Sequence, residues 1–168
     1  MFGGAGEATS APAAATRAGR LLAQLAPAAA DAPPLRSPIT THVLDTCLGR
    51  PAPGVGVTLC RLAPGSAAAW ERVAAGATNR DGRIPDLLPP ADWVQPGRYR
   101  ITFDVAEYQA RCAAEQPAFF GPAAGGGPAR RFYPSVLVEF EIQPQQAREH
   151  FHVPLTWNPF GYSTYRGS

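Results

Sequence analysis

Short apolar runs separated by Gly and Pro dominate the chain from residue 39 onward. The runs are rich in Val, Ile, Thr, Tyr and Phe, a composition typical of β-strands bounded by turns. We predict strands at ITTHVLDT (39–46), GVGVTLCRL (54–62), WERVAAGATN (70–79), GRYRITFDV (97–105), SVLVEFEIQ (135–143), HFHVPLTW (150–157) and GYSTYRGS (161–168). Seven or eight strands of this length fit an all-β sandwich of two sheets.

Alternation within the runs assigns the two faces of each strand. In SVLVEFEI (135–142) every even-numbered residue is apolar, whereas two of the odd-numbered residues are glutamates. The same period places His42 opposite its apolar neighbours, and places His150 and His152 opposite Phe151. We therefore predict that the apolar side chains point inward and that all three imidazoles point outward.

One segment breaks this period. AEYQARCAAEQ (106–116) is rich in Ala, Glu, Gln and Arg, which favours one short helix between two strands. Farther on, FFGPAAGGGPARRFYP (119–134) contains three consecutive glycines and is predicted to be a long loop.

The first 38 residues differ in composition from the rest. They consist largely of Ala, Gly, Pro and Ser and contain no aromatic residue after Phe2. Such a segment buries too little apolar surface to offset its ordering entropy. We predict a disordered extension over residues 1–38 and one domain over residues 39–168.

Charge and cysteine usage narrow the possible partners. The net charge is only +2, which gives no electrostatic case for nucleic acid or an anionic membrane, and no apolar run is long enough to span a bilayer. The three cysteines form no C-x-x-C pair, so we expect reduced thiols.

RAGRLLAQLAPAAA (17–30) is similar to a peroxisomal address, so the expected location is intracellular, either peroxisomal or cytoplasmic.

The candidate chemistry rests on imidazoles and one arginine. His42 and the pair His150 and His152 lie on predicted strands, where a histidine is often only a surface or hydrogen-bonded structural residue. The H-x-H spacing also suits an open zinc site, although no carboxylate or thiolate cluster accompanies it. Arg83 follows an Asp81-Gly82 turn, and it is either an exposed hairpin residue or a fixed guanidinium that binds flat ligands through their oxygens.

Four segments carry a family resemblance. They are ITTHVLDTCLGRPAPGVGVTL (39–59), T-x-x-D-G-R (78–83), H-x-H-V-P-L (150–155) and the terminal Tyr165-Arg166-Gly167-Ser168. In order and spacing they resemble the transthyretin-like 5-hydroxyisourate hydrolases, in which the terminal tetrapeptide distinguishes the hydrolases from the hormone-carrying transthyretins. The chain departs from the family's pattern at 156–158, where Trp157 bears on packing between dimers, and in the loop around 125–127.

The resemblance implies an eight-stranded, two-sheet, transthyretin-like sandwich with one short helix. It implies a homotetramer, built as a dimer of dimers, with active sites in the channel where the dimers meet. The implied reaction is the hydrolysis of 5-hydroxyisourate to 2-oxo-4-hydroxy-4-carboxy-5-ureidoimidazoline in urate degradation. This is cyclic amide hydrolysis with a small-molecule substrate, and it implies no cofactor, no metal, no nucleic acid and no membrane.

The family's functional positions fall on five residues of this chain. The resemblance assigns catalysis to His42, Arg83, His152 and Ser168, and substrate binding to His42, Arg83 and Tyr165. Which histidine is the general base stays open. The alternatives are a carrier that binds a flat aromatic ligand in a central channel, a structural β-sandwich module and a zinc hydrolase.

Overall fold

The computed structural model describes residues 1, 34–120 and 132–167, and one compact unit spans Leu35–Ser168. This unit begins four residues before the predicted boundary at 38/39. The extension predicted to be disordered and the predicted glycine-rich loop fall largely outside the described residues.

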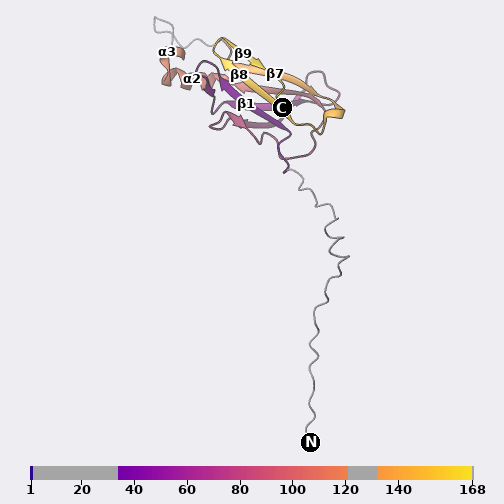
Figure 1. Cartoon of the computed structure of the whole chain (residues 1–168). Helices are drawn as coiled ribbons and strands as arrows, with labels where there is room; N and C mark the ends of the chain where they lie inside the picture. The colour runs from indigo at the N-terminus through magenta and orange to yellow at the C-terminus, as the bar shows by residue number, and fades with distance from the viewer. Residues whose placement is uncertain (2–33, 121–131, 168) are drawn as a thin grey trace. The chain divides into compact units, whose positions relative to one another are not determined.

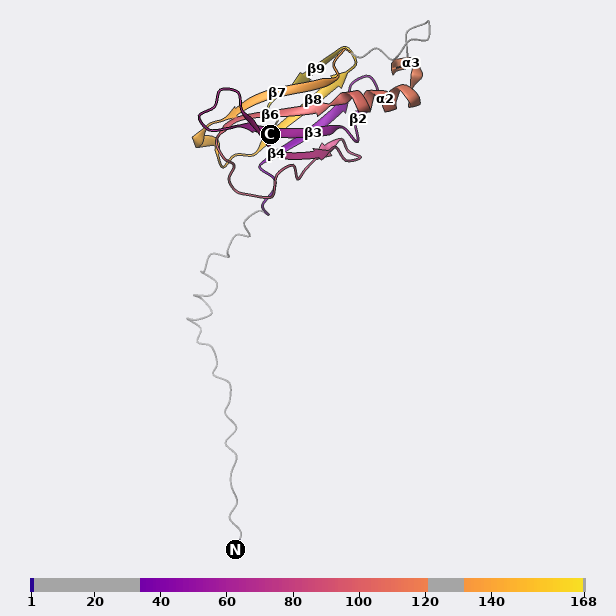
Figure 2. The same ribbon diagram turned by 180° about the vertical axis from the view of Figure 1, so that it is seen from behind.

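Two sheets form the compact unit (Figures 1 and 2). Sheet A has the order β2 (Arg50–Pro51), β1 (Ile39–Asp45), β8 (Phe151–Asn158) and β9 (Gly161–Thr164), and β5 (Arg83–Ile84) pairs with the other half of β1. Sheet B has the order β4 (Trp70–Ala77), β3 (Gly56–Leu62), β6 (Gly97–Asp104) and β7 (Ser135–Ile142). The prediction of an all-β, two-sheet sandwich is confirmed.

Each predicted strand overlaps an observed one, whereas the two-residue strands β2 and β5 were not predicted. The helical elements are α2 (Val105–Glu115), α3 (Pro117–Phe120) and the 3₁₀ turn η1 (Pro144–Gln146). Helix α2 confirms the predicted short helix and lies at one end of the sheets in both views (Figures 1 and 2). No helix of the described ranges is long and apolar enough to cross a membrane.

Strand alternation fills the core between the sheets. In β1, Ile39 and Val43 are fully buried, while Thr40 and His42 on the other face are partly exposed. In β7, Val136 and Ile142 are buried as the alternation predicts. The largest fully buried side chains are Trp157, Phe103, Ile39, Leu59, Ile101, Ile142 and Leu155. The apolar face of each strand therefore points inward, which leaves the imidazole-bearing face of sheet A outside the core.

Helix α2 is fixed to the sandwich by a buried carboxylate. The Asp104 side chain caps the helix by accepting from the Ala106 N–H at 3.2 Å. One turn later, the Tyr108 hydroxyl donates to Asp45 at 2.9 Å. Asp45 is fully buried and also accepts two backbone N–H bonds from the residues that follow β1, so its charge is well satisfied. Burial and the contacts with Cys112 and Asp45 raise the pKa of Tyr108, so the phenol stays a donor.

Trp157 belongs to this core. Its side chain is fully buried, stacks on Phe120 at 6.3 Å between ring centroids and meets Tyr108 edge to face at 5.7 Å. The indole faces inward beneath the helices and offers no exposed surface to another subunit, and an effect of Trp157 on packing between dimers stays a prediction. Its neighbour Thr156 takes the outward position and bonds Ser163 through the two hydroxyls at 2.7 Å.

The turn at 79–83 connects the two sheets. It leads from β4 of sheet B to β5 of sheet A, so the hairpin interpretation of this segment is wrong. The Asn79 side-chain oxygen accepts from the N–H groups of Asp81 and Arg83, each at 2.9 Å. Gly82 adopts φ +69° and its carbonyl accepts from Val43 N–H at 2.8 Å, which ties the turn to β1.

Gly82→Ala is expected to destabilise the fold because a Cβ at this position would lie 2.5 Å from the Val43 carbonyl oxygen. Gly65→Ala is the matched control, since Gly65 has φ +73° but nothing within 4 Å of its Cβ position. We expect Gly82→Ala to lower the free energy of unfolding by about 1–3 kcal/mol more than Gly65→Ala. Urea denaturation of both variants measures this difference, and equal losses would contradict the proposed close contact.

Candidate active site

Three adjacent strands of sheet A bring the predicted histidines and arginine together. In the antiparallel pairing of β1 with β5, His42 is the register partner of Arg83. In the parallel pairing of β1 with β8, Thr40 is the register partner of His152. Since register partners lie on the same face of a sheet, His42, Arg83 and His152 share the outer face. The structure thus assembles these three residues from distant segments, while their roles stay predictions.

Thr40 lies between two of the imidazoles. Its Oγ1 is 2.9 Å from Nδ1 of His152 and 3.2 Å from Nε2 of His150. Both histidines are partly exposed, and Phe151 between them is buried on the inner face. The outward orientation predicted for the imidazoles is therefore confirmed for this pair, and a single hydroxyl connects them.

A pocket of about 320 Å³ opens beside this pair. Its lining consists of Arg36, Thr40, Thr41, Arg83, Pro85, His150 and His152. Two guanidinium groups and two imidazoles line it, and no carboxylate of the described residues does. Such a pocket suits a small planar ligand with several carbonyl oxygens or a negative charge. His42 lies next to Arg83 but outside the lining of this pocket.

The segment after β9 returns to His152. The Gly167 N–H donates to the His152 carbonyl at 2.8 Å, in an isolated antiparallel bridge. A Cβ on Gly167 would lie 2.6 Å from Cδ2 of the imidazole, so only glycine permits this close approach. The last described residues therefore pack directly against the ring, and Ser168 lies outside the described residues.

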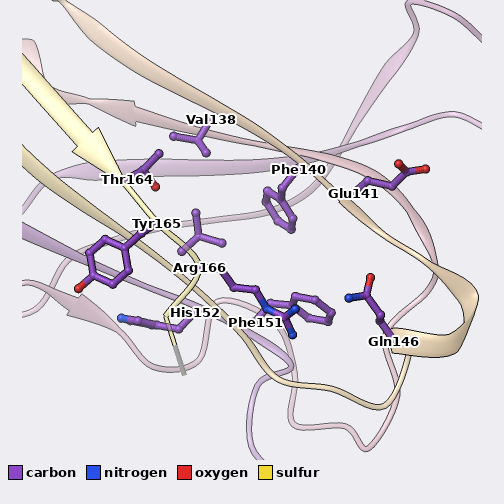
Figure 3. Close-up of a pocket in the computed structure, with 10 residues that line it drawn as sticks. Val138, Phe140, Glu141, Gln146, Phe151, His152, Thr164, Tyr165 and Arg166 are labelled. Atoms are coloured by element: carbon purple, nitrogen blue, oxygen red, sulfur yellow. The ribbon is translucent and has the colours of Figure 1, made fainter.

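A second hollow of about 250 Å³ is lined in part by this segment (Figure 3). Tyr165 and His152 both contribute to its lining, together with Phe140 and Phe151. Tyr165 is 61% exposed, so its ring is available to a ligand or to another subunit. His152 thus borders both hollows, whereas Tyr165 does not line the pocket that holds Arg83.

The three imidazoles favour the neutral form. Burial and then the positive charge of Arg83 lower the pKa of His42, against an opposing effect of Asp81. Burial, Arg83 and the other two histidines lower the pKa of His152. For His150, burial and Arg36 lower the pKa. A neutral imidazole keeps one lone pair, which a general base requires.

A metal centre has little support in this geometry. Within 34–120 and 132–167, no group of three or more His, Cys, Asp or Glu side chains is placed to hold a metal ion. His150 and His152 instead share the Thr40 hydroxyl.

Thr40 and Arg36 were not predicted as site residues. The alternation that places His42 outward also places Thr40 there, so the face of Thr40 was available from the sequence. Arg36 falls within the predicted extension, and no local pattern signals its position. It is placed by long-range contacts, since its carbonyl accepts from Ala91 N–H at 3.1 Å and the buried Ser37 hydroxyl accepts from Leu88 N–H at 3.0 Å.

Removing Arg83 should raise the pKa of one set of histidines, and removing Arg36 should raise the pKa of another. We expect Arg83→Gln to raise the pKa of His42 and His152, because it removes a positive charge that disfavours imidazolium there. Arg36→Gln is the matched control and should raise the pKa of His150 instead. Titration of the imidazole C2 protons by NMR measures all three values. An identical response of the three rings to both variants would contradict this placement of charge.

Comparison with known proteins shows the family of this chain. The model of the HIUase/Transthyretin family matches residues 39–167. The 5-hydroxyisourate hydrolase of Mus musculus is 41% identical over 133 residues, covering 79% of this chain and 96% of the mouse protein. The uric acid degradation bifunctional protein of Arabidopsis thaliana is 40% identical over 141 residues, which is 79% of this chain but only 38% of the plant protein.

A solved structure of a 5-hydroxyisourate hydrolase is also similar to this chain. The structure of Klebsiella pneumoniae 5-hydroxyisourate hydrolase matches with a TM-score of 0.56 and 31% identity, covering 77% of this chain and 97% of that chain. The match over nearly the whole sandwich, together with the assembled histidines and arginine, leads to one conclusion. The chain belongs to the HIUase/Transthyretin family.

Proposed function

We propose that this chain hydrolyses 5-hydroxyisourate to 2-oxo-4-hydroxy-4-carboxy-5-ureidoimidazoline in urate degradation. The observation that carries the proposal is the placement of His42, Arg83 and His152 on one face of sheet A, in a chain whose matched relatives are named 5-hydroxyisourate hydrolases. A carrier of flat aromatic ligands would not need this set of residues.

The reaction opens a cyclic amide by attack of water on the ring carbonyl. It needs a base for the water proton, a donor for the carbonyl oxygen as charge develops, and a proton for the leaving nitrogen. Neutral imidazoles meet the first need, and they return the proton to nitrogen after ring opening. The Arg83 guanidinium offers a planar set of N–H donors to the oxygen.

The charge of the pocket suits the product as well as the substrate. Hydrolysis creates a carboxylate, and two guanidinium groups line the pocket, with no carboxylate among its described lining residues. We assign His42 and His152 to proton transfer, Arg83 to binding and polarising the substrate oxygen, and Tyr165 and Ser168 to orienting hydrogen bonds. The proposed reaction uses only these side chains and no metal ion.

We propose a homotetramer on the basis of two strand edges that no other described strand pairs with. β7 and β9 are the edge strands of sheets B and A, and both lie along the same long side of the sandwich (Figures 1 and 2). Large exposed apolar side chains occur here, including Leu137 of β7 and Tyr162 of β9. Unpaired edges with exposed apolar groups favour pairing with a second copy. Pairing at these edges forms a dimer. Two such dimers then meet through the outer face of sheet A, which carries the half-buried histidines.

A spectroscopic assay tests the proposed reaction. 5-Hydroxyisourate is generated in place from urate and urate oxidase, and its absorbance decay is followed with and without the chain. We expect the chain to accelerate the decay, and to do so equally after treatment with a chelator. Decay at the uncatalysed rate would refute the enzymatic function, whereas loss of activity with the chelator would refute metal independence.

Two substitutions test the assigned residues. His152→Ala should lower kcat/KM by at least about a hundredfold, because the proton-transfer group is lost. Arg83→Lys should lower it by about a hundredfold, because an ammonium cannot reproduce the planar donor set. Arg100→Lys is the control on sheet B, where Arg100 bonds Glu139 at 3.2 Å, and it should retain the wild-type rate. Full activity of a folded His152 or Arg83 variant would contradict the assignment.

Native mass spectrometry tests the assembly. We expect a species of four 17.7 kDa chains. Leu137→Arg should shift it toward smaller species, because it places a charge on the exposed edge strand β7. Val73→Arg is the control, since Val73 is similarly exposed on β4, the opposite edge of the same sheet. A monomeric wild-type chain would contradict the tetramer.

A further inference from the structure

The Thr40 hydroxyl has two imidazole nitrogens within hydrogen-bonding distance and only one hydrogen to donate. Its Oγ1 lies 2.9 Å from Nδ1 of His152 and 3.2 Å from Nε2 of His150. It can therefore donate to one ring and accept from the other. The direction of these two bonds fixes which nitrogen of His152 carries the proton.

Only one direction leaves His152 able to act as a base toward the pocket. Its Nδ1 faces Thr40, so Nε2 is the nitrogen left for a ligand. For Nε2 to keep its lone pair, Nδ1 must carry the proton and donate it to Thr40. The hydroxyl hydrogen must then go to another acceptor, and His150 Nε2 is within reach.

We propose that Thr40 and His150 are positioning residues for catalysis, and that the chain His152 Nδ1–H to Thr40 Oγ1–H to His150 Nε2 makes His152 Nε2 the general base. This inference rests on the proposed hydrolase function. It assigns a role to His150, which the predicted mechanism leaves unused. It also identifies His152, and not His42, as the general base.

The surroundings of His150 support its role as an acceptor. Burial and the guanidinium of Arg36 disfavour a second proton on this ring, so it stays neutral. A protonated His150 would donate to Thr40 and so reverse the direction of both hydrogen bonds. Arg36 therefore acts at a distance on the tautomer of His152, because together with burial it keeps the His150 ring uncharged.

His42 lacks the same access. Its Nε2 is buried with no hydrogen-bond partner among the described residues. His42 does not line the pocket that Arg83 and His152 share. A buried nitrogen outside the pocket is poorly placed to receive a proton from water, whereas His152 borders the pocket directly.

Paired variants test the hydrogen-bond chain. Thr40→Val removes the hydroxyl, and His150→Leu removes the acceptor, so that the hydroxyl turns to donate to His152 Nδ1. Both should lower kcat/KM by about ten- to a hundredfold, the range expected when an orienting partner is lost. Thr40→Ser and His150→Gln keep a hydroxyl and an acceptor, and should recover most of the activity. Thr102→Val, on β6 of the other sheet, controls for loss of a half-buried strand hydroxyl.

The tautomer itself is measured by imidazole ¹⁵N NMR. With three histidines in the sequence, single variants assign every ring. We expect His152 of the wild-type chain to be protonated on Nδ1, and to move toward the Nε2-protonated form in Thr40→Val and His150→Leu. The double variant should be no less active than the worse single variant, because the residues act as one unit.

The outcomes separate this inference from the proposed function. An Nε2-protonated His152 in the wild-type chain would overturn the inference even if hydrolysis occurs. So would wild-type kcat/KM in folded Thr40→Val and His150→Leu, with folding checked by circular dichroism. A wild-type protein without hydrolase activity would refute the proposed function and with it the catalytic role of His152. The NMR result would still decide the direction of the hydrogen bonds from His152 through Thr40 to His150.

Discussion

The parallel pairing of β1 with β8 is the constraint on which the rest of the structure depends. It aligns Ile39–Asp45 with Phe151–Trp157 and places Thr40 beside His152. A shift of one residue would turn the imidazoles into the core and the apolar residues into solvent. Burial of Ile39, Val43 and Leu155 prevents this shift, so the packing that stabilises the sandwich also sets the geometry of the site.

The same positive charges serve two purposes in the pocket. Arg83 and Arg36 lie close enough to the histidines to disfavour imidazolium, and both line the pocket. Together with burial, which has the larger effect on each ring, they keep the bases unprotonated near neutral pH while attracting an electron-rich ligand. Among the residues that the structure describes, the lining contains no carboxylate that would oppose either effect. An acidic residue in place of Arg36 would weaken both effects together.

The sequence predicted the elements better than their connections. Period-two alternation correctly assigned the faces of β1, β7 and β8, because the side chains of a strand alternate whatever the strand pairs with. It could not reveal β5, since two residues carry no period, and so a hairpin stayed one of the two interpretations of the turn before Arg83, although the turn crosses between sheets. The burial of Trp157 was not predicted, because its environment depends on α2 and α3, which lie elsewhere in the chain. Arg36 and the bridging role of Thr40 likewise depend on contacts between distant segments.

The distance in sequence between the paired strands has a consequence for folding. Thr40 and His152 are separated by 112 residues, so a long loop must close before they meet. Pairings of this kind form late and slow the folding of β-proteins. During synthesis, β1 must wait for β8 to emerge from the ribosome with its apolar face and one edge uncovered. The segment that builds the site is therefore also the one most exposed to chaperones and to misassociation before the chain is complete.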